Sequence, residues 1–311
     1  MQYELKISGA PQDDGAIDLD RLAQLANGLR DIAKGALQIR LLGSSQSKGR
    51  ETRKLNDALR IRLKGLKSGS TVLQLECESF RTTLTHIQGD FFKPNLLERL
   101  PNQSPLALVM ETFTDALSDS GDDSDYLDKP LLNDLQDFKK LFLDDNEVFS
   151  LQHEGGAPEL SLMRKDFQRI KSMEDRTPNP APVILSGMVE ILQYSKSKIV
   201  ILTEEGRSLN GVLAEGLLTS EASKYWGKKV TISGTAHFRP SGRMAFVEVE
   251  RMFEPSEKDE YFSRPPRRET VEQQLERQIQ QKGLQNRFGN FIGILTEAGQ
   301  SIEDDLKILT R

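Results

Sequence analysis

The first forty residues change from a strand-like to a helix-like pattern of apolar positions. Residues 3–8 place apolar side chains at every second position, as a half-buried strand does. Residues 17–43 then repeat leucine, alanine and isoleucine three and four positions apart, which predicts a long helix. Asp18 or Asp20 is suited to cap the start of that helix, because a short carboxylate accepts hydrogen bonds from its first free amides.

Two further patterns complete the expected N-terminal domain, residues 1–150. Residues 58–67 and 71–80 both alternate and flank Gly69, which predicts a β-hairpin. From residue 94 to residue 149 apolar side chains recur at helical spacing, and the polar positions between them are mostly acidic. We therefore expect an α+β domain with an acidic helical extension.

A second domain is expected in residues 183–253, after a connector at 151–182 that ends in closely spaced prolines. Five strand-like runs lie there, with one helical run between the third and the fourth. Three strands, a helix and two strands is the order of an OB-fold, a small five-stranded β-barrel, and residues 183–253 resemble it. Glycines stand inside three of the runs, where a tightly curved barrel often needs them: Gly187, Gly211 and Gly234.

The rest of the sequence is expected to be a linker with a polar helix, 254–283, and a helical or extended tail, 284–311. The linker is charged and contains consecutive prolines, yet the tail returns to apolar residues. Two explanations stay open: the tail packs on its own chain, or it orders on a partner. Exposed apolar residues at the end of a polar tether favour the partner. The candidate partner-binding residues are Phe288, Phe291, Ile292, Ile294, Leu295, Leu306 and Arg311.

The stretch "RFGNFIGILTEAGQSIEDDLKILTR" is similar to the C-terminal tails of antitoxins that neutralise PIN-domain ribonuclease toxins. Those tails carry an aromatic and aliphatic cluster, a glycine, a polar turn and a short acidic helix. The resemblance covers about twenty-five of the 311 residues. It implies that the Phe and Ile cluster fills a groove on the toxin, and that a basic residue such as Arg311 approaches the toxin's acidic metal site. The small DNA-binding domain with which such antitoxins usually begin is not the pattern found here.

Composition narrows the class of protein without naming a reaction. The formal net charge is −5, so no overall charge attracts the chain to nucleic acid. The single cysteine excludes an intrachain disulfide, and no signal-like or membrane-spanning apolar run is present. A cytoplasmic, bacterial-type protein is expected, with no membrane association and an unknown oligomeric state.

No familiar catalytic or metal-binding motif occurs. The three histidines lie in different segments, and no phosphate-binding loop or nucleophile motif is found. We therefore expect a non-enzymatic protein without metal or cofactor. Its expected function is to bind a protein partner, as an antitoxin-like neutraliser or a subunit of a bacterial toxin or defence system. A hydrolase with an unrecognised site is a third class.

Nucleic-acid binding is the alternative. The basic stretch 48–67 aligns three cations on one expected strand face, and OB-folds often stack bases on aromatic side chains beside cations. The candidates are Arg60, Arg62, Lys64, Tyr194, Lys198, Lys229, Phe238, Arg239 and Arg243. Trp226 ends the helix that normally closes the barrel, so we expect it in the core. The competing interpretation of the basic stretch is an ordinary solvated sheet face.

Overall fold

The structure is a computed structural model of an α+β protein. Residues 1–268 form one compact unit and residues 269–311 a second one. The whole second unit, and with it every candidate residue of the tail, lies outside the described residues. Those described are 1–9, 15–46, 53–67, 71–84, 100–154, 156, 159–193, 198–204, 206–214, 217, 219–256, 259 and 262–266.

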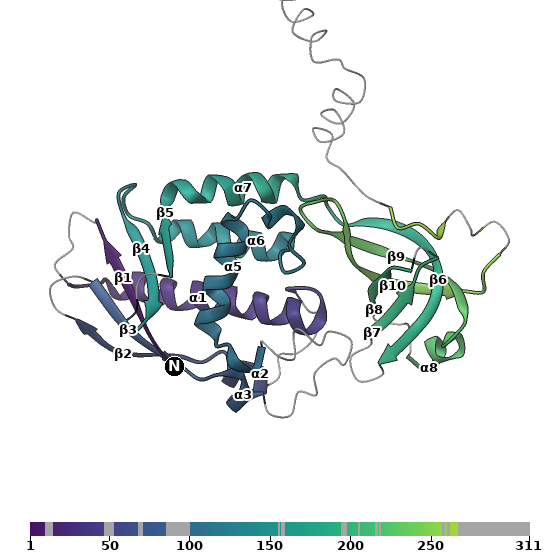
Figure 1. The fold of residues 1–311 in the computed structure, drawn as a ribbon, viewed down its shortest axis with the longest axis horizontal. Helices are drawn as coiled ribbons and strands as arrows, with labels where there is room; N and C mark the ends of the chain where they lie inside the picture. Colours follow the sequence, from purple (N-terminus) through teal and green to yellow (C-terminus); the bar gives the residue numbers. More distant parts are fainter. Residues whose placement is uncertain are drawn as a thin grey trace, which may run out of the picture. The chain divides into compact units, whose positions relative to one another are not determined.

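An antiparallel sheet organises the N-terminal part (Figure 1). Its strands lie in the order β2-β3-β1-β4-β5, and the predicted first strand and hairpin are confirmed. The two strands β4 and β5 fall where the sequence indicated the end of a helical stretch and a connector. Both are short, and β4 pairs with β1 from the other end of the domain. The bounds are β1 Gln2–Ser8, β2 Ile61–Lys67, β3 Thr71–Cys77, β4 Val148–His153 and β5 Leu160–Met163.

Helices cover one face of this sheet (Figure 1). The predicted long helix is α1, Leu19–Leu42; Asp18 caps it by accepting hydrogen bonds from the backbone amides of residues 20 and 21, and Gly43 ends it in the left-handed conformation. The other helices are α2 Arg53–Ala58, α3 Phe80–Thr83, α5 Pro105–Leu117, α6 Lys129–Phe138 and α7 Phe167–Arg176. Short 3-10 turns lie at Leu100–Asn102, Gly121–Asp123, Lys139–Leu141 and Arg164–Asp166.

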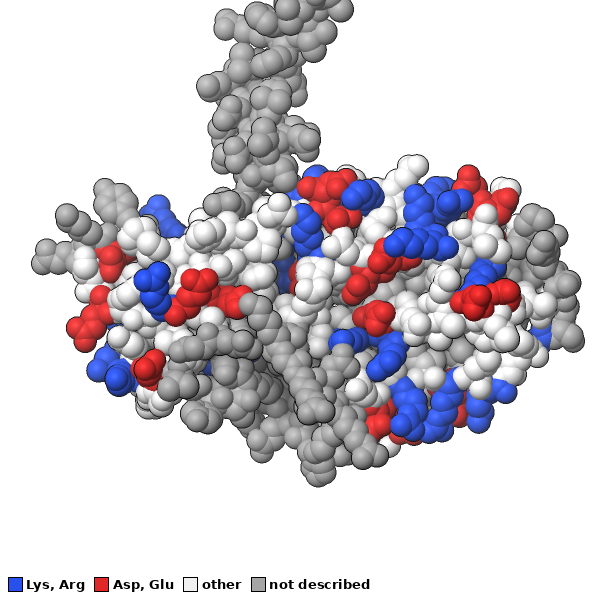
Figure 2. Space-filling view, turned by 180° about the vertical axis from the view of Figure 1, so that it is seen from behind, with Lys and Arg blue, Asp and Glu red and all other residues white. Residues whose placement is uncertain are grey.

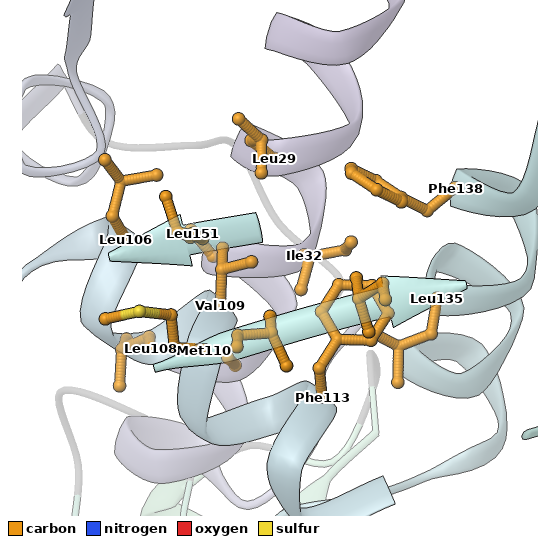
Figure 3. Packing of buried hydrophobic residues seen from close by; sticks show 14 of the residues in the cluster. Leu29, Ile32, Leu106, Leu108, Val109, Met110, Phe113, Leu135, Phe138 and Leu151 are labelled. Carbon is orange, nitrogen blue, oxygen red and sulfur yellow. The ribbon is translucent and has the colours of Figure 1, made fainter. Parts of the chain in front are cut away.

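The core between helices and sheet is apolar and rich in phenylalanine. Alternate residues of β1 are buried against the helices, which is why its other face stays polar. In Figure 3 the side chains of Leu29 and Ile32 from α1 converge on Phe113 from α5 and Phe138 from α6. The rings of Phe113 and Phe138 meet edge to face with centroids 5.5 Å apart. This packing covers the side of the sheet that faces the helices.

Residues 181–253 form the expected closed five-stranded barrel. Its order is β10-β8-β7-β6-β9, with β10 parallel to β8 and the other neighbours antiparallel. This strand order is compatible with the predicted OB-like barrel. The elements are β6 Ala181–Gln193, β7 Lys198–Leu202, β8 Ser208–Leu213, α8 Thr219–Ala222, a 3-10 turn Ser223–Tyr225, β9 Lys229–Phe238 and β10 Met244–Phe253.

The strand glycines are where the barrel wall closes most tightly. A Cβ atom on Gly234 would lie 2.0 Å from the carbonyl oxygen of Glu248, and one on Gly187 would lie 2.7 Å from that of Leu202. A Cβ atom on Gly211 would lie 2.7 Å from a methyl group of Ile199. Only glycine permits these approaches, so the role predicted for the three residues is confirmed.

Candidate functional site

The chain does not leave the barrel directly after β10. We call residues 254–266 the strap, because two of its polar side chains bind the outside of the barrel. The first is Asp259, whose Oδ2 accepts a hydrogen bond from Thr231 Oγ1 at 2.6 Å and one from the backbone amide of Ser256 at 2.7 Å. The hydrogen bond from Thr231 is the main cause that lowers the pKa of Asp259.

The second contact lies near Lys229, two residues before Thr231 in β9. Lys229 donates to Glu204, in the turn between β7 and β8, at 2.6 Å. This bond lowers the pKa of Glu204, and a hydrogen bond from Ser263 of the strap lowers it further. Ser263 is itself buried. Thr231 and Glu204 therefore hold the strap against β9 and the β7–β8 turn.

The strap is the last described segment before the tail. Residues 267–283 separate it from the tail and lie outside the described residues. The sequence prediction gave the strap as part of an extended linker and missed the anchor. One signal was present: Ser256 and Asp259 have the spacing of a capping box, in which a carboxylate binds the backbone amide three residues earlier.

Trp226 is not in the core, and that prediction is wrong. Its side chain is 67% exposed, and the ring Nε1 donates to the backbone oxygen of Glu190 at 3.4 Å. The helix α8 before it has only four residues, Thr219–Ala222. Ala222 and Tyr225 pack against the barrel core instead.

The basic residues of the alternative site are paired with carboxylates close to them. Arg60 binds Asp57 at 2.9 Å, and Lys64 lies 3.4 Å from Glu76. Arg62 lies 3.8 Å from the same Glu76 and 4.0 Å from Glu78. Figure 2 likewise shows basic and acidic side chains interspersed on the face it draws. These pairs favour the competing interpretation of a solvated sheet face, although Arg62 and Lys64 share one carboxylate and stay about half exposed.

The described barrel residues of the alternative site are mostly buried or paired. Phe238 is buried in the barrel core, and Lys198 is 9% exposed. Lys229 binds Glu204, and Tyr194 lies outside the described residues. The remaining two, Arg239 and Arg243, are joined across one turn by a backbone hydrogen bond of 2.8 Å.

Arg239 is held inside the protein rather than offered to a ligand. It is 5% exposed, and its Nη1 donates to the backbone oxygen of Leu127 at 3.0 Å. Burial lowers the pKa of its guanidinium. Arg243 is exposed, and its Nε donates to Ser241 at 3.3 Å. One exposed arginine is a weak phosphate-binding element by itself.

The one buried group of hydroxyl and thiol side chains is unsuited to nucleophilic chemistry, as far as the described residues show. The hydroxyl oxygens of Tyr3 and Ser104 lie 2.7 Å apart beside Cys77. Burial raises the pKa of Tyr3 to about 12 and also raises that of the Cys77 thiol. Within the described residues, no group of three His, Cys, Asp or Glu side chains is arranged to hold a metal ion. None of their helices is long and apolar enough to cross a membrane.

Comparison with known proteins identifies no relative: no protein-family model, curated protein or solved structure matches this chain. The function therefore has to be argued from its own residues.

Proposed function

We propose that this protein is a non-enzymatic, antitoxin-like neutraliser, or a subunit of a bacterial toxin or defence system, that binds a protein partner through its tail. The observation that carries the proposal is the strap. Hydrogen bonds of Thr231 with Asp259 and of Ser263 with Glu204 fix the first part of the linker, which leads to the tail, on the barrel. The barrel then serves as a rigid support from which an apolar recognition segment extends.

The tail supplies the binding energy in this proposal. Phe288, Phe291, Ile292, Ile294 and Leu295 stand within eight residues of one another. Burying an aromatic or branched side chain of this size is worth about 1.5–3 kcal/mol each. The ordering of the segment offsets part of that gain. The partner implied by the resemblance is a PIN-domain-type ribonuclease, whose groove the cluster would occlude while Arg311 approaches its acidic metal site.

A pair of tail variants tests this proposal. Phe291→Ser combined with Ile292→Ser removes two apolar anchors, and Gln300→Ser changes a polar position of the same segment. A PIN-domain ribonuclease encoded in the same genome is assayed on RNA with each protein added. We expect the wild type and Gln300→Ser to inhibit the ribonuclease and the double variant to inhibit it at least tenfold less. Equal inhibition by all three would show that the cluster does not bind the enzyme.

A nucleic-acid-binding accessory protein remains the second candidate, because the strand order of the barrel is compatible with a fold that often binds single strands. Its discriminating property is salt dependence, since contacts to phosphates weaken steeply as salt is added. Binding of a fluorescent single-stranded oligonucleotide is measured at low and high salt. With the candidate cations paired or buried, we expect weak binding that Arg243→Ala alone barely changes.

A further inference from the structure

The edge strand β2 has exposed leucines on the face of the sheet that the helices cover elsewhere. It pairs with β3 on one side, and no described strand pairs with its other side. Leu63 and Leu66 lie opposite Leu75 and Leu73, so they belong to the face that the helices cover. Yet they are 44% and 47% exposed, whereas Leu73 and Leu75 are buried. The helical layer therefore stops before the edge and leaves two exposed leucines beside a strand edge that no described strand pairs.

The opposite face of β2 carries only cations. Arg62 and Lys64 share Glu76 of β3, and Lys67 pairs with Glu4 of β1. Their side chains are 53%, 55% and 48% exposed. Because all these carboxylates lie on the inner side of β2, the cations have no counter-charge beyond the edge among the described residues. A strand added there would meet a row of positive charge on one face and two leucines on the other.

We infer that β2 is a docking edge for an extended segment of a partner protein, with acidic residues on one face and apolar residues on the other. The added strand would hydrogen-bond to the backbone groups along the outer edge of β2. Its carboxylates would pair with Arg62, Lys64 and Lys67, and its apolar side chains would cover Leu63 and Leu66. Opposite charges that face each other across neighbouring strands are favourable.

The charges of β2 also disfavour its pairing with β2 of a second copy of this chain. Antiparallel pairing of two β2 strands that brings Leu63 opposite Leu66 also brings Arg62 opposite Lys67. Like charges that face each other across two strands are unfavourable. Lysines and a bulge on an edge strand are common devices against self-association, and the register of β2 shifts between Leu63 and Gly65. These features disfavour pairing of two identical edges, whereas an acidic strand would meet no such repulsion.

Designed peptides test the inference with the full-length chain. The probe is a fluorescein-labelled peptide in which glutamate alternates with leucine; the control peptides replace glutamate by lysine or carry a central proline. We expect fluorescence anisotropy to detect binding of the acidic peptide and of neither control peptide. Hydrogen exchange should slow at residues 61–67 when that peptide is bound. Equal binding of the acidic and basic peptides, or unchanged exchange in β2, would overturn the inference.

Two pairs of variants distinguish the edge from general surface effects. Lys64→Glu reverses one edge charge, and Lys6→Glu makes the same change on the same face of the central strand β1. Leu66→Ser removes one exposed edge leucine, and Leu143→Ser removes an exposed leucine that lies outside the sheet. We expect the β2 variants to weaken peptide binding on the order of fivefold, and the controls to leave it unchanged. Equal effects within both pairs would refute the edge as the site.

Two other occupants of the β2 edge would give different experimental results. A dimer of the full-length chain in sedimentation that Leu66→Ser dissociates would assign the edge to a second copy. Exchange at residues 61–67 that accelerates when the chain ends at Lys282 would assign it to this protein's own tail. Either result would overturn the inference that a partner protein supplies the added strand. A monomer in which residues 61–67 exchange at the same rate in the full-length and the shortened chain supports it.

Discussion

At the scale of single residues, Asp134 is the clearest source of pH-dependent stability. Burial, with Asp31 and Asp137 close by, raises its pKa to about 6. The folded chain thus holds this proton more tightly than the unfolded chain. The resulting contribution to stability is complete below pH 3.8, the ordinary value, and is lost as the pH rises through 6.

Asp134→Asn should therefore stabilise the protein at pH 8, because the amide resembles the protonated acid. We expect a gain of about 1–2 kcal/mol, discounted for the partial exposure of the side chain. Urea denaturation at several pH values measures it, and the gain should vanish toward pH 4. Asp145→Asn, at an exposed position, is the control. A gain that is the same at pH 4 and pH 8 would contradict the assignment.

Glu147 is the residue whose loss should cost most. It is fully buried, and both its oxygens accept from Arg21, at 2.8 and 2.9 Å. It also accepts from the backbone amide of Leu143 at 2.7 Å. Removing one partner of such a buried pair costs about 3–5 kcal/mol. The free energy of unfolding of Glu147→Ala, measured by urea denaturation, should fall by that amount. That of Asp145→Ala, at an exposed position, should fall by less than about 0.5 kcal/mol. Similar losses for both variants would disprove a special role of the pair of Arg21 and Glu147.

At the scale of the elements, barrel closure depends on Gly234. A side chain there would collide with the carbonyl oxygen of Glu248. Gly234→Ala should destabilise the barrel by about 1–3 kcal/mol or more. Gly65→Ala is the matched control, because the atom it would meet is the end of the flexible Gln74 side chain at 3.1 Å. Trp226, the only tryptophan, reports on the barrel by fluorescence during denaturation; equal midpoints for both variants would contradict this account of closure.

The strap should detach when its anchor is removed. Asp259→Ala deletes the acceptor of both Thr231 and the Ser256 amide. Hydrogen exchange across residues 254–266 should then become faster, while β9 stays protected by its pairing with β6 and β10. Glu254→Ala changes an exposed neighbour and should leave the exchange unchanged. Equal rates in all three proteins would show that the strap is held by something else.

Elements with a strong local period were predictable, and those defined by distant pairing were not. The helix α1 and the hairpin of β2 and β3 follow from spacing, a capping aspartate and a turn glycine. The strand β5 has only four residues, too few to establish a period, and β4 is recognised as a strand mainly by its pairing with β1. The strap could not be found from periodicity, because isolated polar side chains hold it.

At the scale of the whole molecule, the candidate partner-binding residues of the tail are known from the sequence alone. The structure describes the barrel and the strap that precede them. The tail residues stand out because apolar side chains return after a polar linker. Their interpretation stays a prediction, since they lie outside the described residues. The alternative site is weakened by features that no sequence pattern shows, namely the burial of Phe238 and Arg239 and the pairing of Arg62 and Lys64 with Glu76.

The most direct test of partner binding through the tail compares two lengths of the chain. The full-length protein and a version that ends at Lys282 are each used to capture partners from the native host, and the co-purifying proteins are identified by mass spectrometry. Partner docking predicts one protein in stoichiometric amount that the shorter chain no longer retains. The same proteins in both samples would contradict it and would return the tail to this protein's own core.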